Sequence, residues 1–352
     1  MPATDATEFP DVPGLRRSDP EEPGFRRRRR GRGFQYLKSD GSPLRDATEL
    51  ARIKALVIPP AWTEVWICAS EDGHLQAVGT DDAGRRQYRY HDMWREWRDR
   101  EKHDRMLDFA AALPRVRERV TENLAGRGFR RERVLAAAVR LLDLGLFRAG
   151  GEEYAAQNGT YGLATVLREH VHCSGAEIRF DYLAKGAKQR VQAVAEESVC
   201  KVVAGLKRRR HVGQELLAYR DGPDWHSVRS GDINDYIREL ADGDFTAKDF
   251  RTWHATVLAA VGLAVSAKTL NGSDNARRRA VARVVSEVAD YLGNTPSVAR
   301  ASYIGPKIIR LFERGITIDR VLGELGAETQ MGELATQGRA EQAVRRLLLR
   351  YQ

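Results

Sequence analysis

The chain has 352 residues and a mass of 39.5 kDa, which is long enough for two domains. Its composition, 42% hydrophobic and 30% charged, is typical of a globular protein and excludes a disordered or fibrous one. The 58 Lys and Arg residues exceed the 49 Asp and Glu residues, and the resulting net charge of +9 favours a polyanion such as nucleic acid as a partner.

Several classes of protein are excluded by what the sequence lacks. No apolar run approaches the roughly 20 residues that are needed to cross a bilayer. The first residues are acidic and rich in proline, unlike a secretory signal or a transit peptide. Cys68, Cys173 and Cys200 form no CxxC pair, so neither a zinc ribbon nor a disulfide framework is indicated. We therefore expect a soluble, cytoplasmic protein without a bound metal.

Residues 1–33 have the composition of a tail. They contain few large apolar side chains and end in a run of arginines from Arg26 to Arg30, followed by Arg32 between two glycines. We expect a disordered, Arg-rich leader. It could act as an arm on DNA or be a solvated segment, and the sequence leaves both interpretations open.

Residues 34–100 have the pattern of a small, mostly antiparallel β-domain. Apolar residues alternate in 65–70, and the turn Glu71–Gly73 leads into a second run, 74–81, which predicts a β-hairpin. A further turn precedes the strand expected over 85–91. The one helical period before residue 91 lies around Ala47 to Leu56.

From about Met93 onward the pattern is helical, and we assign residues 101–314 to a larger, mostly α-helical domain. The helix signals are the amphipathic period of 130–147, the capping box of Thr246 and Asp249, Ser273 before a helix that Gly293 closes, and Thr295 before Pro296. Glu177 to Val194 alternates on both sides of a Lys-Gly turn, which predicts a hairpin within the helical domain. The expected fold class is therefore α+β.

Residues 315–352 form a C-terminal extension. It ends in a predicted amphipathic helix from Ala340 to Tyr351. This helix could pack on the preceding domain or engage a partner, and the sequence does not distinguish the two.

The familiar enzyme signatures for nucleotides, zinc and serine nucleophiles are missing, including GxGxxG, HExxH and GxSxG. Cations and a tyrosine remain, in the segments LFRAGGEEY, FDYLAKGAKQR, FTAKDFRTWHAT and LGNTPSVARASYI. Phosphoryl chemistry without a metal requires such a set, namely a nucleophile, a proton donor and guanidinium groups for the nonbridging oxygens. Each segment alone is weak, but their order along the chain is specific.

With these segments, the sequence resembles the type IB DNA topoisomerases, in particular the compact bacterial and poxvirus-like branch. The resemblance runs from Phe34 to Leu311 and includes IPPAWTEVWIC and GHLQAVGTDDAGRRQYRYH. It implies a β-rich N-terminal domain and a helical catalytic domain that close as a C-shaped clamp around duplex DNA. Carried over position by position, the catalytic residues are Arg148, Lys185, Arg251, Asn294 and Tyr303.

The resemblance implies transesterification without ATP, metal or any other cofactor. Tyr303 would attack a phosphodiester and form a 3′-phosphotyrosyl link, with Lys185 as the general acid. Ala184 stands where the family usually has glycine before the lysine, so Lys188 remains an alternative acid. Asn294 stands where many members have histidine, and it can donate a hydrogen bond but carries no charge.

The resemblance also implies a DNA-binding strand in the N-terminal domain, with Gln87, Tyr88 and Tyr90 against the major groove and backbone. Arg85 and Arg86 precede them and favour a basic, solvated face. The alternative is that the two tyrosines are packing residues of the sheet.

Two other classes of function remain as alternatives. A tyrosine recombinase shares the catalytic chemistry, but it normally has histidine where this chain has Lys248. A non-catalytic, basic DNA-binding protein would form no covalent adduct. We expect a monomer that acts on duplex DNA at the nucleoid and does not contact membranes.

Overall fold

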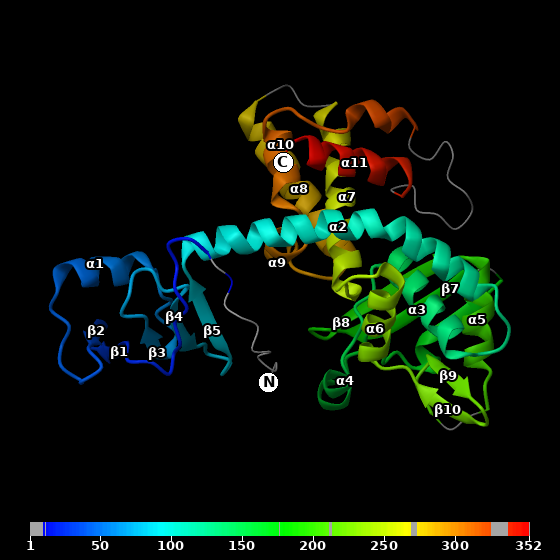
Figure 1. Cartoon of the computed structure of the whole chain (residues 1–352), viewed down its shortest axis with the longest axis horizontal. Coiled ribbons are helices and arrows are strands. Elements are labelled where there is room, and N and C mark those ends of the chain that lie inside the picture. The colour runs from blue at the N-terminus through cyan, green and yellow to red at the C-terminus, as the bar shows by residue number, and fades with distance from the viewer. Residues whose placement is uncertain are drawn as a thin grey trace. The chain divides into compact units, whose positions relative to one another are not determined.

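The computed structural model of the protein describes residues 10, 12–175, 177–210, 213–268, 273–324 and 337–351. The chain divides into two compact units between Asp104 and Arg105, whereas the sequence placed the domain boundary after residue 100 (Figure 1). The N-terminal unit is built on a β-sheet and the C-terminal unit is mostly helical. The predicted α+β fold class is confirmed.

The N-terminal unit is a five-stranded antiparallel sheet in the order β2-β1-β3-β4-β5. Its elements are β1 (Phe25–Arg30), β2 (Gly33–Leu37), α1 (Ala47–Ala55), β3 (Thr63–Ile67), β4 (Leu75–Thr80) and β5 (Arg86–Tyr90). Helix α1 packs on one face, where Ile53 joins Ile67 and Ala77 in a buried cluster. The predicted hairpin is thus confirmed as β3 and β4, and the strand after it as β5.

The prediction of a disordered leader is wrong for Phe25–Arg30, which forms β1 between β2 and β3. The side chain of Arg27 donates hydrogen bonds to the carbonyl oxygens of Ile58 at 3.1 Å and Pro59 at 2.8 Å. Its guanidinium carbon also lies 4.2 Å from the centre of the Phe34 ring. The long aliphatic part of an arginine side chain can cover a half-buried sheet face while its guanidinium group forms hydrogen bonds. The low hydrophobicity of this segment therefore did not exclude a strand. Residues 1–9 and 11 lie outside the described residues.

The C-terminal unit contains most of the helices, and α2 crosses from the first unit into the second. The helices are α2 (Asp92–Leu124), α3 (Arg131–Gly145), α4 (Glu152–Asn158), α5 (Glu197–Lys207), α6 (Ser230–Ala241), α7 (Ala247–Ala267), α8 (Asp274–Leu292), α9 (Pro296–Ser302), α10 (Pro306–Glu313) and α11 (Arg339–Arg350), with 3-10 turns η1 (Arg168–His170) and η2 (Asp319–Glu324). The strands are β6 (Val171–Ser174), β7 (Glu177–Ala184), β8 (Lys188–Ala195), β9 (Ala218–Asp221) and β10 (Asp224–Ser227).

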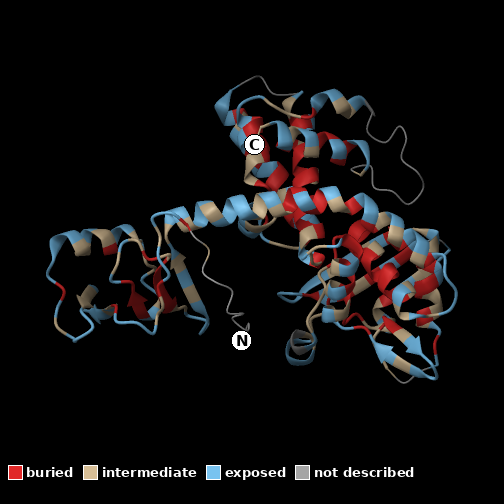
Figure 2. Cartoon of the chain, in the orientation of Figure 1, coloured by how far each residue is buried: buried red, intermediate tan, exposed pale blue. Residues whose placement is uncertain are grey.

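Helices α3 and α7 form the centre of this unit, and Figure 2 shows buried residues along both. Leu135 and Leu142 of α3 and Phe250 and Trp253 of α7 are almost completely removed from solvent. Burial of such side chains contributes about 1.5–3 kcal/mol each. The two helices that lead into the candidate site are therefore held by the largest core of the protein.

The helix ends form as the sequence predicted. In the capping box of α7, the backbone N–H of Thr246 donates to Asp249 at 2.8 Å. Ser273 caps α8 by accepting from the backbone N–H of Ala276 at 3.2 Å. Gly293 ends α8 with a positive φ of 62°, a conformation that favours glycine. The predicted hairpin within the helical domain is confirmed as β7 and β8, with Ala184 opposite Lys188 at its tip.

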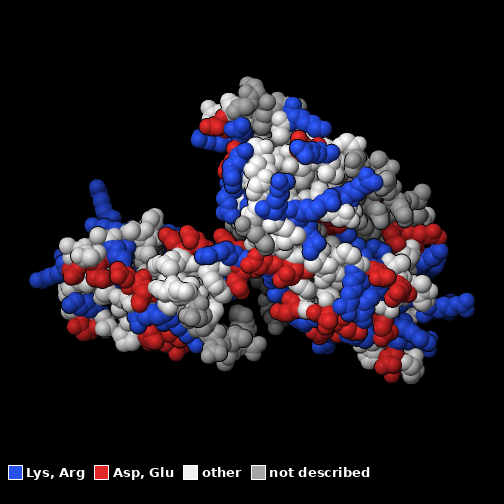
Figure 3. Space-filling model, turned by 45° about the horizontal axis from the view of Figure 1, so that its top comes forward, with Lys and Arg blue, Asp and Glu red and all other residues white. Residues whose placement is uncertain are grey.

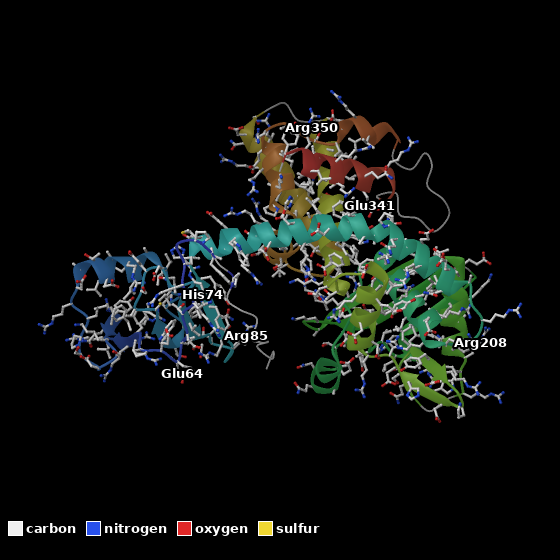
Figure 4. All side chains as sticks on the ribbon, in the orientation of Figure 1. Glu64, His74, Arg85, Arg208, Glu341 and Arg350 are labelled. Atoms are coloured by element: carbon white, nitrogen blue, oxygen red, sulfur yellow. The ribbon has the colours of Figure 1, made fainter. Side chains whose placement is uncertain are left out.

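The C-terminal helix α11 packs on the other helices of the C-terminal unit, the first of the two options that the sequence left open. Glu341 of α11, labelled in Figure 4, is nearly buried. Its carboxylate accepts from Nη1 of Arg117 at 2.6 Å and from Nε1 of Trp253 at 2.9 Å. Arg117 also donates two hydrogen bonds to Asp143, at 2.8 and 2.9 Å, and His254 lies 2.9 Å from the same carboxylate. One buried polar network thus joins α2, α3, α7 and α11.

Asp143 is ionised at the centre of this network. Burial by itself would raise the pKa of its carboxyl, but the charge of Arg117 and the hydrogen bonds from Arg117 and His254 outweigh it. The pKa of Asp143 therefore lies well below its ordinary value.

Candidate active site

Arg148 lies just after the end of α3, in a segment whose backbone is closely packed. Leu146 takes a left-handed conformation, with φ of 52°, and turns the chain out of the helix. Gly150 then meets Gly162 so closely that a Cβ on Gly162 would lie 2.4 Å from the Cα of Gly150. The carbonyl of Arg148 accepts from the backbone N–H of Leu163 at 2.8 Å. The glycines thus allow the contact that fixes the backbone carrying Arg148.

Arg251 lies in the second turn of α7 and is almost fully buried. Its Nη1 donates to the carbonyl of Leu146, and its Nη2 donates to the carbonyl of Leu292 at 2.9 Å. Its Nε is buried and has no hydrogen-bond partner among the residues that the structure describes. Burial lowers the pKa of Arg251, and the nearby charge of Arg148 lowers it further. A buried cation with an unused donor is suited to an anionic ligand.

Asn294 joins Arg148 directly. Nη2 of Arg148 donates both to the side-chain oxygen of Asn294 and, at 3.0 Å, to the carbonyl of Gly293. Because the oxygen of Asn294 accepts from Arg148, its amide nitrogen is left as a donor. That nitrogen is buried and has no partner within the described parts of the chain. An acceptor from a ligand would satisfy it.

Tyr303 follows α9, where its backbone N–H donates to the carbonyl of Ala299 at 3.0 Å. The guanidinium carbon of Arg251 lies 5.0 Å from the centre of its ring. Burial opposes ionisation of the phenol, but the charges of Arg251, Arg148 and Lys248 outweigh it and lower the pKa of Tyr303. The phenol is thus the side chain here that most resembles an activated nucleophile.

The two candidate acids lie on either side of the hairpin tip. Lys185 is exposed on the turn between β7 and β8. Lys188, the alternative, lines a cavity of about 220 Å³ together with Arg148 and Asn294. The structure thus brings together Arg148, Asn294, Arg251 and Tyr303, and it leaves the choice between the two lysines open.

Arg190 of β8 lines the same cavity, and sequence reasoning did not identify it. The alternation of side chains along the hairpin strands could have indicated it. Arg190 pairs with the buried Tyr182 on β7, so it belongs to the face of the hairpin that turns to the core. A charged residue that is half-buried on the inner face of a hairpin is a candidate for a specific role.

The positive charges at this site lack acidic partners. In the part of the chain that the structure describes, Arg148, Arg190 and Arg251 form no ion pair with a carboxylate. Their hydrogen bonds go to carbonyl and amide oxygens and, for Arg190 and Arg251, also to the hydroxyl groups of Tyr182 and Tyr303. Asp290 is the acidic residue among those lining the cavity, and it is exposed. Crowded cations without counter-charges favour a bound anion.

The residues predicted to bind DNA from the N-terminal sheet divide between its two faces. Tyr88 and Tyr90 are 47% and 39% exposed, so they are surface residues and not packing residues of a core. Their rings stack with centroids 6.1 Å apart, and Arg86 is exposed on the same strand face. Gln87 points to the other face and donates to Asp81 at 2.8 Å, and Arg85 forms an ion pair with the same carboxylate at 2.9 Å.

The described residues contain neither a cluster of metal ligands nor a helix that could span a membrane. Within the described ranges no three His, Cys, Asp or Glu side chains come together as metal ligands. In the same ranges, every helix is too short or too polar to cross a bilayer. On the face of the molecule in Figure 3, lysine and arginine side chains gather over the C-terminal helices of the second unit.

Comparisons with known proteins identify the family of the chain. Residues 91–313 match the family described as "Eukaryotic DNA topoisomerase I, catalytic core", and residues 33–81 match "Bacterial DNA topoisomerase IB, N-terminal domain". DNA topoisomerase 1B of Acanthamoeba polyphaga mimivirus is 27% identical over 297 residues, which are 82% of this chain and 88% of the relative.

Two further relatives carry related names. DNA topoisomerase 1B of Vaccinia virus (strain Copenhagen) is 20% identical over 66% of this chain and 71% of its own length. DNA topoisomerase 1 alpha of Arabidopsis thaliana is 26% identical over 64% of this chain, which corresponds to 24% of the plant protein. Since one family covers most of the helical unit and another covers strands β2, β3 and β4 of the N-terminal sheet, the chain belongs to the DNA topoisomerase I family, in its type IB form.

Proposed function

We propose that this chain relaxes supercoiled duplex DNA by cutting and resealing one strand through a covalent bond to Tyr303. The observation that supports this most strongly is the pair of buried donors that have no partner among the described residues, Nε of Arg251 and the amide nitrogen of Asn294. They lie in a site with a tyrosine whose pKa is lowered by its surroundings. A phosphodiester supplies the acceptor oxygens and negative charge that these groups lack.

In the proposed reaction, the phenolic oxygen of Tyr303 attacks the phosphorus, and the bond from phosphorus to the 5′-oxygen breaks. The phenol loses its proton to solvent, and the leaving 5′-oxygen receives one from the general acid. One phosphodiester is exchanged for another, so the step needs neither ATP nor a redox partner. The strand with the free 5′-hydroxyl rotates, and the reverse reaction then reseals the DNA.

Arg148, Arg251 and Asn294 bind the nonbridging oxygens as negative charge grows on them. Each preorganised donor of this kind contributes about 3–4 kcal/mol to the stability of a transition state. Arg251 also favours the ionised phenol, because its charge lies close to the ring of Tyr303. We assign the general acid to Lys185, which the family resemblance favours, and keep Lys188 as the alternative.

DNA binding outside the site is assigned to the N-terminal sheet. Tyr88, Tyr90 and Arg86 present hydroxyl groups and charge on one exposed strand face, which suits contacts with phosphates. We also propose that the two units clamp duplex DNA and that the protein acts as a monomer at the nucleoid. The proposed catalytic residues all come from one chain, which supports the monomer.

The test is supercoil relaxation by the purified chain in EDTA and without nucleotide, followed on agarose gels. We expect relaxation of both positive and negative supercoils, and a steep loss of activity at high salt because phosphate contacts dominate affinity. A strict requirement for ATP or a divalent metal would contradict the proposal. Strand exchange between two duplexes without relaxation would instead favour a recombinase.

A further inference from the structure

We propose that Arg190 is a further catalytic residue, a third guanidinium that binds the scissile phosphodiester beside Arg148. This inference rests on the proposed function, since it names another contact to the same substrate. The cavity near the hairpin tip is lined by Arg190 and Lys188, which belong to β8. It is also lined by Arg148, which follows α3, and by Asn294, which follows α8.

The strand period puts Arg190 on the inner face of the hairpin. In β7, Ile178, Phe180 and Tyr182 are buried and alternate with more exposed residues. Arg190 lies opposite Tyr182 in the antiparallel register, and cross-strand partners share a face. Arg190 is therefore half-buried on the inner face of the hairpin, where a charged group loses part of its hydration and costs stability unless a partner compensates for it.

Hydrogen bonds hold the side chain of Arg190 in one orientation. Its Nη2 donates to the carbonyl of Tyr291 at 3.0 Å, and its Nε donates to the side-chain oxygen of Gln192 at 3.1 Å. Gln192 in turn donates to the carbonyl of Gly145, at the end of α3. Arg190 is thus tied to both the end of α8 and the end of α3, the helix ends that precede Asn294 and Arg148. Such preorganisation is what a transition-state contact requires.

Arg190 and Arg148 converge on one point at the end of α8. A Cβ added to Gly293 would lie 3.0 Å from Nη1 of Arg190 and 3.8 Å from Nη1 of Arg148. Gly293 is followed directly by Asn294, whose buried amide nitrogen finds no acceptor in the described segments. The two guanidiniums and the amide therefore surround a small volume beside a glycine, whose missing side chain leaves room for a ligand.

The electrostatics of this arrangement favour an anion between the two arginines. Burial lowers the pKa of Arg190, and the charge of Arg148 lowers it further. Arg190 also lowers the pKa of Arg251, so all three cations repel one another. Within the residues that the structure describes, Arg190 forms hydrogen bonds to the carbonyl of Tyr291, the amide oxygen of Gln192 and the hydroxyl of Tyr182, and to no carboxylate. Bound phosphate would relieve this repulsion, and it would benefit from each guanidinium.

The test compares DNA cleavage by Arg190→Ala and by the wild type on two duplex substrates under single-turnover conditions. One substrate has an ordinary scissile phosphodiester. The other has a methylphosphonate there, in which a methyl group replaces one charged oxygen. We expect Arg190→Ala to slow cleavage of the ordinary linkage by about 100-fold or more, the usual effect of removing one such donor. On at least one methylphosphonate stereoisomer the loss should fall below about 10-fold, because the charge that Arg190 contacts is absent.

A matched control is Arg179→Ala on β7, whose exposed side chain pairs with Asp181 at 3.9 Å and points away from the core. It should cleave both substrates like the wild type. Arg190→Lys keeps the charge and should lose less activity than Arg190→Ala on the ordinary linkage. It also serves as the test variant if Arg190→Ala does not fold, as judged by thermal unfolding.

Two outcomes would overturn the inference. Cleavage of the ordinary linkage by Arg190→Ala within about threefold of the wild type would mean that Arg190 does not bind the reacting phosphate. An equal loss on the ordinary linkage and both methylphosphonate stereoisomers would mean that Arg190 only supports the fold. If the wild type itself forms no covalent adduct with ordinary DNA, it is the proposed function that fails and not this assignment alone.

Discussion

Replacement of Glu341 by alanine should destabilise the protein strongly, although Glu341 lies far along the chain from the catalytic residues. Its carboxylate is 9% exposed and accepts three hydrogen bonds, from Nη1 and Nη2 of Arg117 and from Nε1 of Trp253. Glu341→Ala leaves the buried Trp253 N–H without an acceptor and removes one of the two carboxylates that pair with Arg117.

The expected magnitude follows from these contacts. Breaking a buried ion pair by removing one partner costs about 3–5 kcal/mol. Arg117 keeps Asp143 as a partner, so we expect the lower end, a loss of about 3 kcal/mol in the free energy of unfolding. For a unit of this size, such a loss lowers Tm by about 6–12 °C. Glu341→Gln keeps the shape and an acceptor for Trp253, so its Tm should lie between those of the wild type and Glu341→Ala.

The measurement is thermal unfolding of the full chain by calorimetry. Glu287→Ala is the matched control, because Glu287 is an exposed glutamate that pairs with Arg283 at 3.7 Å. Such surface pairs contribute about 0–1 kcal/mol, so its Tm should change little. If Glu341→Ala melts at the same temperature as Glu287→Ala, the buried network does not hold α11 on the catalytic unit and the reasoning is wrong.

Three further predictions concern pH, the general acid and the arginine-rich strand. The pKa of Asp143 is lowered in the folded protein, so the contribution of its carboxylate to stability is complete above about pH 4, the ordinary pKa range of Asp, and is lost as the pH falls further. Urea unfolding at pH values from 7 to 2 checks this. Lys185→Ala should cleave ordinary DNA slowly but recover on a substrate with sulfur at the 5′-bridging position, since sulfur leaves without a proton; recovery for Lys188→Ala instead would reassign the acid. Arg27→Ala should lower the free energy of unfolding by about 1–3 kcal/mol, because it removes charged hydrogen bonds to half-buried carbonyls. Arg28→Ala, at an exposed position, should change it by less than about 0.5 kcal/mol in the same urea titration.

The sequence predicted the elements whose signals are local. The capping box of Thr246 and Asp249, the Gly293 helix end and the alternating hairpin all depend on residues a few positions apart, and each was found where expected. The arginine-rich strand was missed because its stability depends on distant backbone carbonyls, at Ile58 and Pro59, which satisfy Arg27. A run of charges carries no local sign of such partners.

The same distinction holds for the candidate site. Arg148, Arg251, Asn294 and Tyr303 could be named from their segments together with a family resemblance, and the structure brings these side chains together. Arg190 could not be named in this way, because its importance comes from the register of β8 and from its approach to Gly293. Contacts between segments far apart in the sequence are set by packing, which periodicity alone does not specify.

The central claim, that Tyr303 attacks DNA, is tested most directly by denaturing capture of labelled duplex DNA followed by peptide mapping of the adduct. We predict that the wild type carries DNA by its 3′ end on Tyr303. Tyr303→Phe removes one oxygen and almost no packing, so it should fold and bind DNA but form no adduct. An adduct on another tyrosine, a 5′ linkage, or no adduct in the wild type would contradict the claim.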